Sequence, residues 1–155
     1  MIFISHRYAD EQKARELSSL LKSKDVESYL DVLDPATRAT VDITKHIMKN
    51  LDGCSHLIVI FSVNTNGSLW VPFELGAAYK GEKGIGTLLV DNVATPQYLD
   101  TFPKMKTSAD IDQYLEEYRA DRKLTKSYSS IRMNESDGNA ANSFIRRVKG
   151  RLRQY

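Results

Sequence analysis

The chain has 155 residues, of which 41% are hydrophobic and 27% charged, values typical of one globular domain with an ordinary core. Its 22 basic and 20 acidic residues leave a net charge of +2, a balance that argues against a nucleic-acid or membrane partner. Cys54 is the single cysteine, and the start of the chain shows neither a signal-peptide pattern nor a long apolar run, so we expect a cytoplasmic location.

The first half of the chain alternates short apolar runs with segments of helical spacing. Residues 2–4 are continuously apolar, as in a strand that is buried on both faces. A polar loop follows, and Asp10 is placed to cap the next helix. Further elements expected in this half are a weaker strand at 26–31, a loop at 32–40 and a helix marked by Ile43, Ile47, Met48 and Leu51, which ends near Gly53.

The second half continues this alternation. Its clearest strand is 56–61, where an unbroken apolar run suits the centre of a parallel sheet. After a polar loop, Ser68 is placed to cap the helix that carries Glu74. Beyond this helix we expect a strand at 85–90, a short edge strand at 102–105, a helix at 108–118, a polar loop or insertion at 120–142, and a basic helix within 143–155.

This order of elements predicts an α/β fold. Strands that alternate with helices form parallel sheets through right-handed crossovers, and the helices cover both faces. We therefore expect one domain over 1–119, to which the C-terminal basic helix also belongs.

The stretch 68–78 is the most informative part of the sequence. Trp70 and Glu74 are four residues apart, so they share one face of a helix that follows the strand at 56–61. In open α/β sheets, ligands bind outside the carboxyl ends of the strands. Glu74 is therefore a candidate for chemistry; the alternative is a surface glutamate near a helix N-terminus, which the helix dipole favours.

Three segments resemble the TIR domain family. The resemblance rests on Ile2-Phe3-Ile4-Ser5-His6 followed by Asp10, on Tyr29-Leu30-Asp31 before a long loop, and on Leu57 to Ser62 followed by Ser68-x-Trp70-x-x-x-Glu74-Leu75. These match the family's first box, its second strand with the "BB" loop, and its third strand with the Ser-x-Trp-x-x-x-Glu segment. The resemblance covers about residues 1–118, with the order of elements preserved. Val71 stands where the family often has Cys, and the loop at 32–40 is not Gly-rich, which leaves the geometry of a substrate lid open.

The resemblance implies a flavodoxin-like three-layer sandwich with a mostly parallel sheet of about five strands. Enzymatic members of the family cleave the nicotinamide–ribose bond of NAD, and the carboxylate that matches Glu74 is essential to them. Some bacterial members release a cyclised ADP-ribose as a messenger in defence against phage, whereas others are scaffolds. For this chain the resemblance implies NAD as substrate, no separate cofactor, self-association, and an effector that senses the product.

The chemistry of this cleavage suits a single carboxylate. Nicotinamide is already a cationic leaving group, so little acid catalysis is needed, whereas the ribose gains oxocarbenium character as the bond breaks. A carboxylate held beside the ribose in a partly desolvated site stabilises that charge. We assign this role to Glu74.

Further candidates for binding the substrate are Ser5, His6, Arg7, Tyr8, Asp31, Arg38, Ser62 and Trp70. The first four follow a strand and precede a helix, a junction where backbone amides favour anions. Arg7 can pair with a pyrophosphate or remain a solvated loop charge. Tyr8 can stack on a flat ring or cover the end of the sheet.

The remaining candidates also have ordinary structural alternatives. Asp31 and Ser62 can each bond the substrate or complete a turn. Arg38 can close over the ligand or stay solvated. Trp70 can form a wall of the ribose pocket, but we expect it first as a core aromatic that anchors the helix against the sheet.

Two groups of residues bear on other functions. His6, His46 and His56 lack metal-ligand spacing, and with one cysteine we expect no metal site. Near the C-terminus lies a group of basic residues: Arg146, Arg147, Lys149, Arg151 and Arg153. This group could attract an anionic partner, but we expect it to form a solvated helix face.

Two rival functions remain open. Phe73-Glu74-Leu75-Gly76-Ala77-Ala78 also resembles the segment around the nucleophilic glutamate of nucleoside deoxyribosyltransferases, although Trp70 and the first-strand box fit TIR domains better. The other rival is a non-catalytic TIR adaptor that acts by homotypic contact through the loop at 32–40. Glu74 argues against the adaptor, because a scaffold does not need that carboxylate.

Overall fold

The computed structural model describes residues 1–30, 42–128 and 140–154, without the side chains of 125–128 and 140. At its centre lies a five-stranded parallel sheet in the order β2-β1-β3-β4-β5. The predicted fold class, including the parallel sheet, is confirmed. The strands are β1 (Ile2–Ser5), β2 (Ser28–Leu30), β3 (His56–Phe61), β4 (Gly84–Leu89) and β5 (Lys104–Met105).

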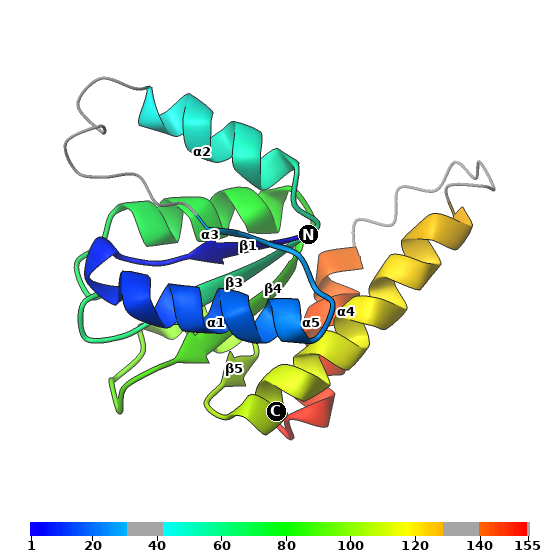
Figure 1. The fold of residues 1–155 in the computed structure, drawn as a ribbon. Helices are drawn as coiled ribbons and strands as arrows, with labels where there is room; N and C mark the ends of the chain where they lie inside the picture. The colour runs from blue at the N-terminus through cyan, green and yellow to red at the C-terminus, as the bar shows by residue number, and fades with distance from the viewer. Residues whose placement is uncertain (31–41, 129–139, 155) are drawn as a thin grey trace.

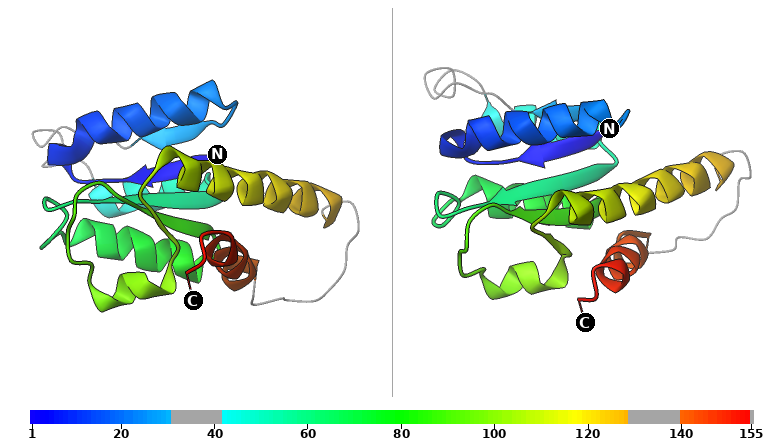
Figure 2. Two further views of the ribbon diagram at one scale, coloured as in Figure 1. Left: turned by 90° about the horizontal axis from the view of Figure 1, so that it is seen from below. Right: turned by 60° about the horizontal axis from the view of Figure 1, so that its bottom comes forward.

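Helices lie on both faces of this sheet (Figures 1 and 2). One face is covered by α1 and α4, and the other by α2 and α3; α5 packs against β4 at one end of the sheet. The helices are α1 (Glu11–Ser23), α2 (Ile43–Asp52), α3 (Trp70–Lys80), α4 (Ser108–Tyr128) and α5 (Ala140–Arg151), with short 3₁₀ turns η1 (Tyr8–Asp10) and η3 (Gln97–Thr101).

The alternation of side chains along the strands divides the core into two layers. Ile2 and Ile4 of β1 join the layer beneath α1 and α4, whereas Phe3 joins the layer beneath α2 and α3. All three are fully buried, as expected for a strand that is covered on both faces. Gly84 of β4 leaves room for the His56 ring beside it, since a Cβ there would lie 2.2 Å from His56 Cδ2.

The C-terminal third differs from the sequence prediction. The helix expected at 108–118 continues to Tyr128, so the predicted polar loop is wrong over 120–128, while 129–139 lies outside the described residues. Four of the residues at 120–124 are good helix formers (Ala120, Arg122, Lys123 and Leu124), and helix propagates more easily than it starts. The final helix begins at Ala140, three residues earlier than predicted.

The basic face of α5 is not simply solvated. Arg147 donates to Glu117 and Asp121 of α4, at 2.7 and 3.0 Å. Arg151 donates to Glu117 at 2.5 Å and to Glu116 at 2.7 Å. These two arginines therefore join the last two helices, and the predicted solvated face is wrong for them.

The strand order determines where a ligand site forms. From β1 the chain moves to β2 on one side and later returns to β3 on the other side. The connections that leave the carboxyl ends of β1 and β3 therefore diverge, and a crevice forms outside these ends. Both Ser5 and the loop that leads into α3 lie at this edge.

Candidate functional site

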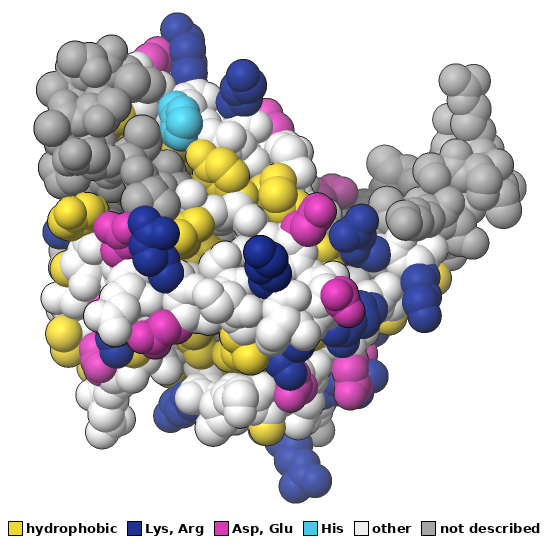
Figure 3. Space-filling view, in the orientation of Figure 1, with side chains coloured by type: hydrophobic (Ala, Val, Ile, Leu, Met, Phe, Trp, Pro, Cys, Tyr) yellow, Lys and Arg dark blue, Asp and Glu magenta, His cyan; other side chains and the backbone are white. Residues whose placement is uncertain are grey.

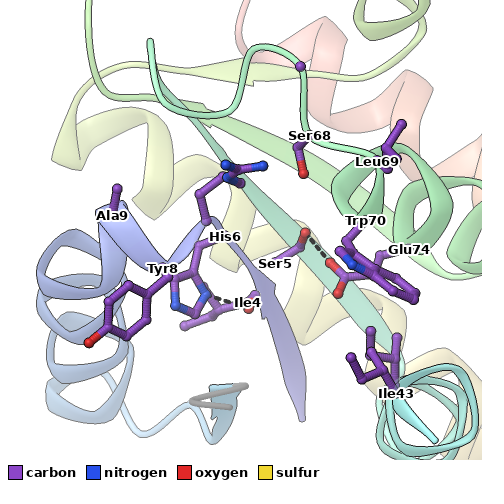
Figure 4. A pocket seen from close by; sticks show the side chains of 13 residues that line it. Ile4, Ser5, His6, Tyr8, Ala9, Ile43, Ser68, Leu69, Trp70 and Glu74 are labelled. Carbon is purple, nitrogen blue, oxygen red and sulfur yellow. Dashed lines mark hydrogen bonds between the residues drawn. The ribbon is translucent and has the colours of Figure 1, made fainter. Parts of the chain in front are cut away.

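A pocket of about 570 Å³ lies at the carboxyl end of β1, within the size range of small-molecule sites. Its walls come from four parts of the chain: the end of β1 with η1, the first half of α2, the loop before α3, and the first turns of α3 (Figure 4). The polar side chains among the lining residues are Ser5, His6, Arg7, Tyr8, Ser68 and Glu74.

Glu74 reaches this pocket because it lies one helical turn after the start of α3. The predicted cap is one residue off, because the N-cap position of α3 is Leu69, which makes no side-chain capping bond. The buried hydroxyl of Ser68, one residue earlier, still accepts a hydrogen bond from the backbone N–H of Val71 at 3.3 Å. Pro72 falls in the first helical turn, where it is tolerated. Glu74 follows on the inner side of the helix with only 6% of its surface exposed, so it is not a solvent-facing surface glutamate.

The Glu74 carboxylate contacts the end of β1. Ser5 Oγ donates a hydrogen bond to Glu74 Oε2, and both side chains are buried. Figure 4 shows the two groups pointing toward each other between the strand and the helix. The contact joins residues 69 positions apart and places a carboxylate at the floor of the pocket.

The three residues that follow β1 also lie at the pocket. His6, Arg7 and Tyr8 all line the pocket. His6 is partly buried, and its Nδ1 lies 3.4 Å from the carbonyl oxygen of Ile4. Arg7 and Tyr8 are exposed at the pocket mouth, where a ligand could reach a cation and an aromatic ring.

Trp70 also lines the pocket, contrary to the core role expected for it. Its side chain is 37% exposed, and its ring contacts Phe73 edge to face at a centroid distance of 5.8 Å. Val71, the next residue, takes the core position instead and is 1% exposed. The helical turn that aims Val71 at the sheet turns Trp70 toward the crevice.

Ser62 lies outside the residues that line the pocket, although it was a predicted binding residue. It is fully buried, and its hydroxyl donates to Asp10 Oδ2 at 2.6 Å. Of its two predicted roles, the structure therefore supports the one within the turn. Asp31 and Arg38, the other two candidates, lie outside the described residues.

Asp10 does not cap α1 as expected, because its side chain makes no capping hydrogen bond. Its carboxylate turns instead toward the loop after β3, where it accepts from Ser62 and, at 2.8 Å, from Asn64 Nδ2. The sequence marks Asp10 as a polar residue before a helix, but only the fold brings that loop within reach.

Several lining residues were not identified from the sequence as part of a site. Ile43 and Ile47 of α2 form one wall of the pocket, and Leu69 stands at the mouth with 85% of its surface exposed. The helical spacing of the two isoleucines predicts an apolar face, but not which element that face meets. In the sequence, the leucine directly before Trp70 is the one local feature that could have indicated an apolar mouth of the pocket.

These walls define what the site can do. A buried carboxylate in a partly enclosed pocket stabilises positive charge on a ligand more strongly than it would in water. The exposed guanidinium of Arg7 offers a contact for an anionic group on the same ligand. The pocket therefore suits a ligand that combines a phosphate-bearing part with a centre that becomes cationic.

Three further observations concern metals, membranes and charge. Among the residues that the structure describes, no group of three or more His, Cys, Asp or Glu side chains could hold a metal ion. No helix in the same residues is long and apolar enough to cross a bilayer. On the face seen in Figure 3, basic and acidic side chains are interspersed rather than separated by sign.

Comparisons with known proteins bear on this arrangement. A family model described as the TIR domain matches residues 2–124. Among curated proteins, the chain is 24% identical over 126 residues to the "Probable 3' cyclic ADP-D-ribose synthase ThsB'" of Bacillus cereus (strain MSX-D12). This match covers 75% of the present chain and 65% of that protein, so the chain spans slightly less than two thirds of its relative.

The fold is similar to that of a solved structure. The TIR domain of the Toll-related receptor TRR-2 from Hydra magnipapillata superposes with a TM-score of 0.60 and 14% identity, over 77% of this chain and 95% of that one. The TIR domains of the activated Roq1 resistosome, which directly recognises the pathogen effector XopQ, give a TM-score of 0.49 and 17% identity, over 97% and 98% of the two chains. Since the family model spans both the sheet and the pocket, the chain belongs to the TIR domain family.

Proposed function

We propose that this TIR domain cleaves the bond between nicotinamide and ribose in NAD, with Glu74 as the catalytic carboxylate. The observation that carries the proposal is the burial of Glu74 at the floor of the pocket, at the carboxyl end of the parallel sheet. The Bacillus cereus relative, named as a probable cyclic ADP-ribose synthase, supports the same class of substrate.

In the proposed reaction, the C1′–N bond breaks and its electron pair leaves with nicotinamide, which becomes neutral. The ribose carries the positive charge as an oxocarbenium ion, and the negative charge of Glu74 stabilises it. Water attack at C1′ with loss of a proton to solvent then gives ADP-ribose, whereas attack by a nucleophile of the same molecule, again with loss of its proton, gives a cyclic isomer. Either product retains the pyrophosphate, for which Arg7 is the exposed cation at the pocket mouth.

We extend the proposal to a signalling role in bacterial defence against phage, in which a cyclic product acts on a downstream effector. Self-association of the TIR domain would then control the rate, as the resemblance to the family implies. NAD turnover should accordingly be measured over a range of protein concentrations and on a surface that clusters the protein.

The direct test is product analysis. The purified chain is incubated with NAD, and nicotinamide, ADP-ribose and its isomers are quantified by chromatography and mass spectrometry. We expect equimolar nicotinamide and ADP-ribose species from the parent. Glu74→Gln should lose activity, whereas Glu27→Gln, which changes an exposed glutamate outside the pocket, should not.

Two outcomes would contradict the proposal. Base exchange with a deoxynucleoside and a free base, without NAD cleavage, would favour the deoxyribosyltransferase reaction. No nicotinamide release at any concentration, even on the clustering surface, would favour a non-catalytic adaptor.

A further inference from the structure

Ser5 lines the pocket, but its hydroxyl proton is donated to Glu74. Ser5 is the last residue of β1 and is 1% exposed, and its Oγ donates to Glu74 Oε2. We propose that Ser5 is a positioning residue, which acts through Glu74 and not through contact with the substrate. This inference rests on the proposed function of Glu74 and reassigns Ser5 from the binding role that the sequence suggests.

The location of Ser5 makes it a rigid support. β1 is paired on both sides, with β2 and with β3, and Ser5 is in register with Val59 of the central strand β3. The residue has little freedom to move, because its neighbours Phe3 and Ile4 are fully buried in the two core layers. A donor fixed in this way determines where the carboxyl group of Glu74 lies.

Hydrogen-bond chemistry limits what Ser5 can donate to a substrate. A serine hydroxyl carries one proton, so it donates to one acceptor at a time. While it donates to Glu74, it offers no donor to a substrate hydroxyl. Such a bond to a carboxylate is charge-assisted and favours the ionised form, which is the form that stabilises an oxocarbenium ion.

Two serine hydroxyls position Glu74, one through the backbone of α3 and one through the carboxyl group. The hydroxyl of Ser68 holds the first turn of α3 through the N–H of Val71, which places the backbone of Glu74. Ser5 then orients the carboxyl group itself. Precise orientation matters because electrostatic stabilisation depends on groups that are already aligned before the charge develops.

The test compares Ser5→Ala, which removes the donor, with Ser5→Thr, which retains a hydroxyl. We expect kcat for NAD cleavage to fall by about ten- to a hundredfold in Ser5→Ala, the size expected for one hydrogen bond to a charged group, with KM little changed. The acid limb of its pH–rate profile should move to higher pH, and Ser5→Thr should recover part of both losses.

A control and a second measurement separate positioning from stability. Ser18→Ala removes another serine hydroxyl in a side-chain hydrogen bond, 2.8 Å from Ser28 Oγ and outside the pocket, and should not move the acid limb. The Glu74 side-chain carboxyl is also titrated by carbon NMR without substrate, where Ser5→Ala should raise the midpoint relative to the parent.

Each outcome decides between the alternatives. A higher KM with unchanged kcat in Ser5→Ala would show that Ser5 contacts the substrate and would overturn the inference, as would an unchanged NMR midpoint. If Glu74→Gln keeps the parent's NAD turnover, the proposed function fails. The NMR titration still tests the Ser5–Glu74 contact in that case, because it requires no turnover.

Discussion

Ser62 Oγ donates a 2.6 Å hydrogen bond to Asp10 Oδ2, across 52 positions of sequence. Asn64 adds two bonds to this pair, from Nδ2 to Asp10 and from its backbone N–H to Ser62 Oγ. The loop after β3 is therefore fastened to the turn after β1. Because this loop leads directly to Ser68 and α3, the buried Asp10 carboxylate supports one wall of the pocket.

We expect Asp10→Asn to lower the free energy of unfolding by about 1.5–3 kcal/mol, since hydrogen bonds to a buried charged acceptor are lost or weakened. It should also raise KM for NAD, because the wall that carries Ser68 and Leu69 loses its support. Chemical denaturation and steady-state kinetics check the two effects. The control is Asp112→Asn. Asp112 lies on α4, is half exposed and pairs with Lys24, so its substitution should lower the free energy of unfolding by less than about 1 kcal/mol. Equal effects of the two substitutions on stability would contradict the role of Asp10.

Trp70 should contribute to ligand binding more than to stability. Its side chain is 37% exposed and lines the pocket, so Trp70→Ala removes ring contact with the ligand but little core packing. We expect the Kd for NAD to rise by about five- to tenfold, the value of one aromatic contact, with a small change in Tm. As a control, Tyr98→Ala removes an aromatic side chain that is 44% exposed and lies outside the pocket, so it should leave the Kd for NAD unchanged. If Trp70→Ala instead lowers Tm strongly, Trp70 has the core role.

His56 should make stability depend on pH. Burial, aided by the positive charges of the N-terminus and Arg122, lowers the pKa of His56 from 6.5 to about 3. Asp121 lies 3.6 Å from its Nε2, but with a neutral ring the two form no ion pair. As pH falls below 6.5 the unfolded chain binds a proton that the folded chain does not, so stability decreases toward pH 3.

This one group contributes up to about 1.4 kcal/mol per pH unit to that decrease. Denaturation of the parent and of His56→Leu between pH 6.5 and 5 measures the contribution, in a range where most carboxylates stay ionised. The slope should be smaller in His56→Leu. Equal slopes in the two proteins would show that the ring is protonated in the folded state.

The junction of α4 and α5 should depend on Glu117 far more than on its neighbour. Glu117 has 9% of its side chain exposed and bonds both Arg147 and Arg151, whereas Glu116 is 57% exposed and bonds Arg151 alone among the described residues. Glu117→Gln leaves two guanidinium groups without their shared carboxylate, so we expect a loss of about 1–3 kcal/mol. Glu116→Gln should cost less than about 1 kcal/mol, and the reverse order would contradict this account.

The pH dependence of stability gives a second test of Glu117. Burial alone would raise the pKa of Glu117, but hydrogen bonds from Arg151 and Arg147 outweigh it and lower the pKa below 4.5. A lowered pKa means that the stabilisation is present above pH 4.5 and is lost as pH falls through the folded-state value. The stability difference between the parent and Glu117→Gln should therefore narrow below pH 4.5.

Local patterns in the sequence were sufficient to predict the fold class and the position of Glu74 at the edge of the sheet. The apolar runs at 2–4 and 56–61 indicate buried parallel strands, and that order places Glu74 at the carboxyl edge of the sheet. Helical spacing likewise brings Trp70 and Glu74 to one side of α3. These features depend on neighbours in sequence, which a pattern can reveal.

Contacts between distant segments could not be predicted in the same way. The carboxylate of Asp10 is satisfied by residues 52 and 54 positions away, so the local expectation of a helix cap failed. Residues 120–128 are mostly polar, yet they continue α4, whose carboxylates bond arginines of α5. Ile43 and Ile47 show an apolar face, but only the packing of α2 against α3 turns it to the pocket.

The central claim is that Glu74 acts on the transition state, so the decisive measurement is kcat/KM for nicotinamide release together with NAD affinity in the parent and in Glu74→Gln. The glutamine keeps the shape of the side chain and an oxygen that accepts from Ser5. We predict that kcat/KM falls by about 10²–10³-fold, as for the loss of one preorganised electrostatic group, while the Kd for NAD changes less than about threefold. A correctly folded Glu74→Gln variant that releases nicotinamide at the parent's rate would contradict the account.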